Sequence, residues 1–331
     1  MNDLKKQAEY LVDKFGSVRA ASRETGIPRS TLRHRLAKED ESYTVQELPP
    51  ADIPIEQVVD HLHSRFKVKK KNKESKKWIN VNMKSDLPIG LLWFGDPHID
   101  DSHCDWDALR DHLDVVNSYE GIYGCSLGDQ QNNWVGRLGR LYGEQETSAK
   151  TAWKLVEWMI EEMNPLILIG GNHDMWSGAG DPLKWIAQPH TIMEDWEARI
   201  QINFPNGAST RIHAAHDMPG HSQFNALHAQ GKMAKLKGTA ELYISGHRHN
   251  WALSQIELVE EEKAVWLARA RGYKYFDNYA FTKGFEQQKF GQGILQVINP
   301  LDENPLSRVQ CFADPRHGAE YLAWLRSNRQ P

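Results

Sequence analysis

The chain has 331 residues and a formal net charge of −4, with 40% hydrophobic and 25% charged residues, which indicates a globular protein with one large domain and a smaller one. No stretch approaches the roughly 20 apolar residues of a membrane span, and the polar N-terminus lacks a signal-peptide pattern, so we expect a cytoplasmic protein without a membrane partner. The three cysteines, Cys104, Cys125 and Cys311, are far apart and form no CxxC pair, so the sequence indicates neither a disulfide framework nor a zinc ribbon.

The first 40 residues carry apolar side chains at helical spacing in three short segments. The first segment ends at Gly16, the second covers residues 17–24, and the third begins at Pro28, where a first helical turn tolerates proline. The expected inner face comprises Leu4, Ala8, Leu11, Val12, Phe15, Val18, Ala21, Leu32 and Leu36. The pattern predicts a small all-α helix-turn-helix domain over residues 1–40.

Residues 41–84 have the composition of a linker. They are first acidic, then contain prolines, then allow one helix over residues 55–66, and finally reach a run of seven lysines against one glutamate in residues 67–77.

Residues 85–331 alternate short apolar strands with amphipathic helices, which predicts an α/β domain with a largely buried sheet. The expected strands cover residues 89–94, 122–127, 166–169, 200–204, 211–215, 242–245 and 265–268, and the expected helices cover residues 107–116, 149–163 and 181–187. In such domains ligands collect where strands end.

Five of these strand or loop ends carry Asp, Asn or His. They read Gly95-Asp96-Pro97-His98, Gly128-Asp129, Gly170-Gly171-Asn172-His173-Asp174, His213-Ala214-Ala215-His216-Asp217 and Gly246-His247-Arg248-His249. Oxygen and imidazole ligands of this kind suit Mn, Fe, Zn or Ni. A glycine just before a ligand lets the backbone approach the site closely.

In this order the motifs D-x-H, G-D, G-N-H-D, H and G-H-x-H, spread over residues 91–250, resemble the calcineurin-like metallophosphoesterase superfamily. The resemblance implies a β-sandwich flanked by helices and two divalent ions, Mn first, with Fe, Ni or Zn as alternatives. The implied ligands are Asp96, His98 and His249 for one ion, Asn172, His216 and His247 for the other, and Asp129 as the bridge between them. His173 is implied to be a catalytic histidine outside the ligand shell.

The chemistry explains these residue types. Two divalent ions about 3.5 to 4 Å apart share a bridging hydroxide, which is the expected nucleophile, and polarise the phosphoryl oxygens. His173 is then expected to act as general acid toward the leaving oxygen, an effect of roughly 10²- to 10⁴-fold in rate.

Two points of this assignment stay open. The family commonly has an acidic residue or a histidine three positions after the bridging Asp to orient the catalytic histidine, whereas this chain has Asn132, and Asp174 is the alternative for that role. His213 and His221 are alternatives to His216, although strand alternation leaves His216 at the strand end.

Residues 16–36 resemble the helix-turn-helix segment of pipsqueak-like and resolvase-like DNA-binding domains. The residues expected to face DNA are Arg29, Ser30, Thr31, Arg33 and His34, with Lys69, Lys70 and Lys71 adding non-specific phosphate affinity. A three-helix unit for dimerisation is the alternative. For Arg269, Arg271 and Lys274, a substrate channel and a solvated strand end are equally open.

We therefore expect a two-metal phosphodiester hydrolase acting on DNA, a nuclease with an N-terminal targeting domain. One alternative is a phosphomonoesterase or small-nucleotide phosphodiesterase with a localising N-terminal domain; another is a DNA-binding regulator with a vestigial metal site. DNA is the expected partner, and self-association into a homo-oligomer is left open. The architecture resembles proteins of bacteria and their phages, so the expected compartment is the cytoplasm of a bacterium or of a phage-infected host cell.

Overall fold

The computed structural model describes residues 2–25, 27, 29, 32, 36, 54–75, 78–134, 136–175, 182–187, 190–275 and 288–328. The chain divides into two compact units, Met1–Lys76 and Lys77–Pro331. Within the described ranges, no helix combines the length and the apolar character needed to cross a bilayer.

The smaller unit contains the helices α1 (Asn2–Phe15), α2 (Val18–Thr25) and α4 (Ile55–Ser75). Ala8, Ala21 and Leu32 are its buried centre, and Leu11, Val12, Phe15, Val18, Ile27 and Leu36 pack around them. The first two predicted helices are confirmed, and most of the third lies outside the described residues. Helix α4 continues past the predicted end at residue 66 through much of the lysine run, because lysine is a good helix former.

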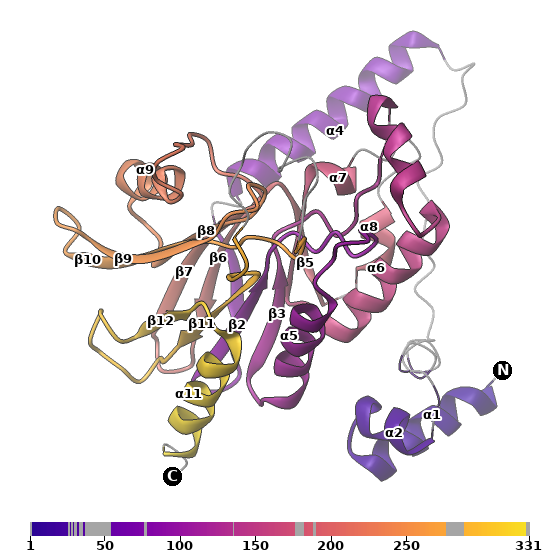
Figure 1. Cartoon of the computed structure of the whole chain (residues 1–331), viewed down its shortest axis with the longest axis horizontal. Helices are drawn as coiled ribbons and strands as arrows, with labels where there is room; N and C mark the ends of the chain where they lie inside the picture. Colours follow the sequence, from indigo (N-terminus) through magenta and orange to yellow (C-terminus); the bar gives the residue numbers. More distant parts are fainter. Residues whose placement is uncertain are drawn as a thin grey trace. The chain divides into compact units, whose positions relative to one another are not determined.

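The larger unit contains two sheets and several helices (Figure 1). Its strands are β1 (Ile79–Asn82), β2 (Ile89–Phe94), β3 (Ile122–Ser126), β4 (Ile167–Gly170), β5 (Ile192–Asp195), β6 (Glu197–Asn203), β7 (Ser209–Ala215), β8 (Leu242–Ser245), β9 (Ala252–Leu258), β10 (Lys263–Arg269), β11 (Gly293–Ile298) and β12 (Val309–Phe312). Its helices are α5 (Trp106–Ser118), the 3-10 helix η1 (Gly136–Glu144), α6 (Ala149–Met163), α7 (Asn172–Met175), α8 (Pro182–Ile186), α9 (His228–Lys237) and α11 (Pro315–Ser327). Every strand and helix expected for this unit overlaps an observed one.

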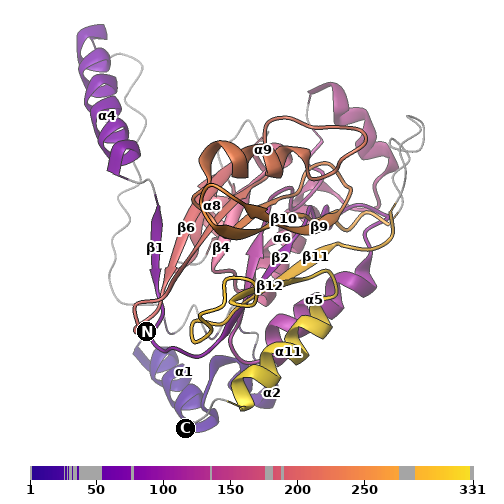
Figure 2. The same cartoon turned by 90° about the vertical axis from the view of Figure 1, so that its left-hand side faces the viewer.

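Each sheet has six strands. One has the order β1-β6-β7-β8-β10-β9, and the other has the order β12-β11-β2-β3-β4-β5, with β2, β3, β4 and β5 parallel. Strand β1 lies along the edge of β6 (Figure 2), and Ile79–Asn82 pairs with Ile200–Asn203. These residues therefore belong to the larger unit, although they fall inside the predicted linker of residues 41–84.

The two sheets pack face to face around one hydrophobic core, which joins β2, β3, β4 and β11 to β6, β7, β8 and β10. A second cluster buries the outer face of β2 and β3 under α5, α6 and α11, and a third buries the outer face of β8 and β10 under α9. Helices α5 and α11 thus lie on one side of the stacked sheets and α9 on the other (Figure 2). The expected α/β fold, a sandwich of sheets flanked by helices, is confirmed.

The motif-bearing loops all follow strand ends at one edge of this sandwich. Three follow the parallel strands β2, β3 and β4, and two follow the parallel strands β7 and β8 of the other sheet. Backbone hydrogen bonds connect the loops: His98 N donates to Asp129 O at 3.1 Å, and Gly246 N donates to His216 O at 3.0 Å. The fold therefore brings side chains from both sheets to one place.

Candidate metal centre

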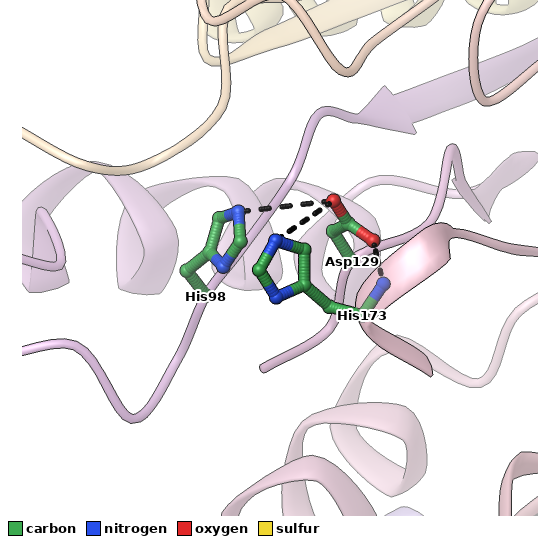
Figure 3. A group of neighbouring side chains, drawn as sticks. All are labelled: His98, Asp129 and His173. Carbon is green, nitrogen blue, oxygen red and sulfur yellow. Dashed lines mark hydrogen bonds and ion pairs between the residues drawn. The ribbon is translucent and has the colours of Figure 1, made fainter. Parts of the chain in front are cut away.

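His98, Asp129 and His173 form the first group of candidate ligands, shown in Figure 3. The Oδ2 atom of Asp129 lies 4.0 Å from His98 Nε2 and 3.9 Å from His173 Nε2. The other oxygen, Oδ1, accepts a hydrogen bond from the backbone N–H of His173 at 2.9 Å. His173, expected outside the ligand shell, therefore points its Nε2 at the same carboxylate oxygen as His98.

Asp129, His216 and His247 form the second group. His216 Nε2 lies 3.3 Å from Asp129 Oδ2, 2.9 Å from His247 Nδ1 and 3.0 Å from Asn172 Oδ1. Within each group the ligand atoms lie within 4.8 Å of one another, and Asp129 is common to both. This arrangement is the one that a bridging carboxylate requires.

Asp96 and His249 join the two groups. Asp96 Oδ2 lies 3.4 Å from His249 Nε2, and Asp96 Oδ1 lies 3.7 Å from His216 Nδ1. The ring of His249 is 5.1 Å from the ring of His98. All seven residues expected to hold metal ions are thus assembled at one edge of the sandwich.

Buried polar atoms test whether these residues fit divalent ions. Asp96 Oδ1 and both ring nitrogens of His98 are buried and have no hydrogen-bond partner among the described residues. Leaving such atoms without partners costs roughly 1 to 3 kcal/mol each, whereas a cation would satisfy the oxygen and one of the nitrogens. The mixed oxygen and imidazole donors are those expected of Mn, Fe, Zn or Ni, so the residues fit.

The backbone at the site is strained. Among the described residues, left-handed φ angles occur at His98 (40°), Asp129 (52°), His247 (67°) and His249 (50°), four of the candidate ligands. Such conformations disfavour side chains with a Cβ and persist where the surrounding structure imposes them, which occurs most often at functional sites.

The electrostatics of the second group centre on one ion pair. Burial acts to lower the pKa of His216, but the charge and the hydrogen bond of Asp129 outweigh it and raise this pKa to about 10. Burial acts in the opposite sense on Asp129, and His216 again outweighs it and lowers the pKa of the carboxyl to about 2. A divalent ion held by the same atoms would take the place of the imidazole proton.

The other imidazoles favour the neutral form that binds metals. Burial, with Lys274 next, holds the pKa of His98 well below its ordinary value. Burial and the charge of His216 lower the pKa of His247 to about 4. Burial also lowers the pKa of His173, although Asp129 acts against it.

The contacts of Asn132 and Asp174 differ from those expected. The ring Nδ1 of His173 meets the backbone carbonyl of Asn132, while the side-chain amide of Asn132 donates to Asp101 Oδ2 at 2.9 Å. The carboxylate of Asp174 accepts backbone N–H groups from Asp129, Gln130 and Gly171 at 2.7, 2.9 and 2.9 Å. Asn132 thus contacts the catalytic candidate through its backbone, and Asp174 fixes the loop that carries Asp129.

Of the three histidines considered for one position, only His216 lies in the cluster. His213 Nε2 is 3.5 Å from Glu197 and its ring packs 5.7 Å from that of Tyr243, and His221 is exposed. Strand alternation explains the result, because it points His213 toward the face that α9 covers.

The residues expected to bind DNA lie in the smaller unit. Arg29 is half-buried there, whereas Ser30, Thr31, Arg33 and His34 lie outside the described residues. Lys69, Lys70 and Lys71 belong to helix α4, and their side chains are not described.

Two contacts of the site were not predicted. The ring of Trp134 meets that of His173 edge to face at 5.3 Å, and Lys274 Nζ lies 5.2 Å from the centre of the Trp134 ring. Lys274 also pairs with Asp101 at 3.0 Å, so the network of Asp101 and Asn132 extends to a cation. For Lys274 the sequence had left a substrate channel and a solvated strand end open, and its side chain, only 8% exposed, contradicts the second.

No protein-family model matches the sequence, and no curated protein matches it. Among solved structures, the chain is similar to a 5'-nucleotidase precursor from Thermus thermophilus, with a TM-score of 0.37 and 10% identity over 73% of this chain and 59% of that one. It is also similar to a protein of unknown function from Aquifex aeolicus, with a TM-score of 0.26 and 17% identity over 48% of this chain and 78% of that one. The chain thus spans less than two thirds of the nucleotidase precursor, and at these scores neither likeness bears on its activity.

Proposed function

We propose that this chain hydrolyses phosphate esters with two divalent ions and that its substrate is the phosphodiester backbone of DNA. The observation that carries the proposal is the pair of ligand groups that share Asp129. The order of the motifs, which resembles that of the calcineurin-like metallophosphoesterases, supports the same chemistry.

Each side chain would have a distinct task. Bound at the site, two divalent ions would lower the pKa of water and offset the charge of the phosphoryl oxygens. The residues that would hold them are Asp96, His98 and His249 on one side, Asn172, His216 and His247 on the other, and Asp129 between them. His173 contacts the Asn132 carbonyl through Nδ1, which leaves Nε2 facing the cluster. In its imidazolium form, which the charge of Asp129 favours, His173 would pass the Nε2 proton to the leaving oxygen of the substrate.

The proposed polymer substrate rests on the smaller unit. Its first two helices and their small core agree with the sequence pattern of a helix-turn-helix reader. Helix α4 continues this unit with lysines, which favour contact with phosphates. If the smaller unit binds DNA, it brings a phosphodiester polymer close to the phosphoester hydrolase that is joined to it.

Hydrolysis of plasmid, linear duplex and single-stranded DNA beside a chromogenic diester and a chromogenic monoester, with Mn²⁺ added, tests the proposal. Cleavage of DNA and diester that is lost in His216→Gln is the expected result. His213→Gln is the matched control, because His213 is a buried histidine outside the cluster. Hydrolysis of the monoester alone would favour a phosphomonoesterase, and DNA binding without any hydrolysis would favour a regulator with a vestigial site.

A chain beginning at Trp78 tests the role of the smaller unit. It keeps both sheets and every candidate ligand, so turnover of the chromogenic diester should match that of the full chain. Duplex affinity should fall, and its salt dependence should flatten by roughly one logarithmic unit of slope for each phosphate that the shorter chain no longer neutralises. Equal DNA binding by both chains at every salt concentration would refute the reader and leave dimerisation as the better account of that unit.

A further inference from the structure

Arg269 is the last residue of β10 and lies beside the loop that carries two candidate ligands. It pairs in register with Ser245 of β8, and Gly246 to His249 follow directly. Its neighbours Ala268 and Ala270 face the core between the sheets, so strand alternation points Arg269 to the opposite face. The carboxylates of Asp217 and Asp96 both attract its guanidinium, and Asp96 belongs to the ligand cluster.

The side chain is buried, with 2% of its surface exposed. Its Nη1 donates to Asn250 Oδ1 at 3.2 Å, whereas its Nε and Nη2 have no hydrogen-bond partner among the described residues. The sequence alone had left a solvated strand end open for this residue, and its burial overturns that alternative. A charged group buried in this way costs free energy unless something pairs with it.

The two unmatched donors form one edge of the guanidinium. The N–H groups on Nε and Nη2 point side by side, and this fork matches two oxygens of a phosphate. Two carboxylates attract Arg269: that of Asp217, which gives its Oδ2 to Arg248 at 2.8 Å, and that of Asp96, whose Oδ2 accepts the backbone N–H of His247 at 2.7 Å. Asp96 is a proposed metal ligand, and without it Arg269, Arg248 and Asp217 carry a net charge of +1, since two guanidinium groups face one carboxylate.

A purely structural role would account for only part of this arrangement. The bond from Nη1 to Asn250 holds the residue after His249 in place, and an amide or a lysine would serve that purpose as well. It gives no partner to Nε or Nη2. An anion on this edge would satisfy both donors and the excess charge.

We propose that Arg269 is a phosphate-binding residue whose Nε and Nη2 edge holds two oxygens of a phosphate group beside the Asp96 and His249 side of the cluster. The identity of the ligand as a substrate phosphate rests on the proposed phosphoester chemistry. The site itself rests on the burial and the unmatched donors.

Titration of inorganic phosphate into the Mn²⁺-loaded full chain tests the site without turnover. Arg269→Gln should weaken phosphate binding about 10- to 100-fold, since it removes two hydrogen bonds to a charged group. It should raise KM for the chromogenic diester by a similar factor, change kcat less, and leave Mn²⁺ occupancy unchanged. Arg211→Lys is the matched control, because Arg211 lies on β7 far from the end that His216 follows and bonds Gln201.

Arg269→Lys keeps the charge but replaces the fork by one ammonium group, and about tenfold weaker phosphate binding is expected. If Arg269→Gln does not fold, as judged by circular dichroism, this variant decides. Phosphate affinity and KM within twofold of the parent in a folded variant would overturn the site, while diester turnover would still stand. Conversely, phosphate binding that depends on Arg269 in a chain that cleaves no ester would support the site and refute the proposed function.

Discussion

Replacing Gly246 by alanine should displace one candidate ligand of the proposed metal centre, Asp96. A Cβ on Gly246 would lie 2.6 Å from Asp96 Oδ1, whereas ordinary contact begins near 3.4 Å. The carboxylate cannot simply turn away, because its Oδ2 accepts the backbone N–H of His247 at 2.7 Å. Asp96 must therefore shift as a whole, and misplacing a ligand in this way typically weakens metal binding about 10- to 100-fold, or about 1.4 to 2.7 kcal/mol.

Calorimetric titration with Mn²⁺ measures this loss, and thermal unfolding shows whether the fold survives. Gly231→Ala is the matched control: its Cβ would meet only Leu267 Cδ1, at 3.5 Å, and it lies within helix α9. That variant should gain roughly 0.5 to 1 kcal/mol of stability with unchanged metal affinity, because alanine loses less backbone entropy in a helix. If Gly246→Ala binds both ions within twofold of the parent, Asp96 is not a metal ligand.

Three further substitutions give distinct outcomes. Asp129→Asn should lower the occupancy of both ions in a metal analysis, and the loss of one ion only would contradict the bridge. His173→Ala should keep its Mn²⁺ but turn over at least a hundredfold more slowly, with a smaller loss for good leaving groups; metal loss instead would make His173 a ligand. Burial lowers the pKa of His112 from 6.5 to about 4, so neutral His112 contributes stability above pH 6.5 that is lost as the pH falls toward 4. As the pH falls from 6.5 to 4, the unfolding free energy of the parent should decrease by up to about 3 kcal/mol more than that of His112→Gln. Denaturant titrations at each pH measure this, and an equal decrease in both proteins would contradict it.

The sequence predicted best the elements whose local pattern is complete. Strand β2 has the predicted bounds, residues 89–94, because all of its residues are buried and it reads as one apolar run. Helix α6 also has the predicted bounds, residues 149–163, and Ser148 caps it by accepting a hydrogen bond from Thr151 N. Helix α11 was missed although Asp314 and Pro315 give a readable start signal.

The same distinction holds for the candidate site, where the residue types could be predicted and the contacts between them could not. The seven candidate ligands could be predicted because the motifs are recognised from residue types and from their order along the chain. The contact between His173 and Asn132 could not be predicted, since it uses a backbone carbonyl that every residue possesses. The burial of Arg269 depends on which face of β10 meets α9, and that is a property of the assembled layers.

Strand β1 shows the limit most directly and leads to a last prediction. Residues 79–82 alternate apolar and polar side chains over only four positions, which is too short a pattern to separate a strand from a linker, and the pairing with β6 makes them a strand. A chain beginning at Asp86 would lose this strand together with Trp78 and Val81, which pack on the third and first cores, respectively. Partial burial of two such side chains stabilises the unit by about 2 to 4 kcal/mol.

The chain beginning at Asp86 should therefore unfold at lower denaturant concentration than the chain beginning at Trp78, and the bared edge of β6 should promote aggregation. Both chains keep every candidate ligand, so the two should bind the same number of Mn²⁺ ions while folded. Urea titrations followed by tryptophan fluorescence measure the difference, and light scattering detects the aggregation. Equal midpoints and equal solubility would mean that β1 does not stabilise the larger unit. The folded unit would then begin near residue 85, as the sequence predicts.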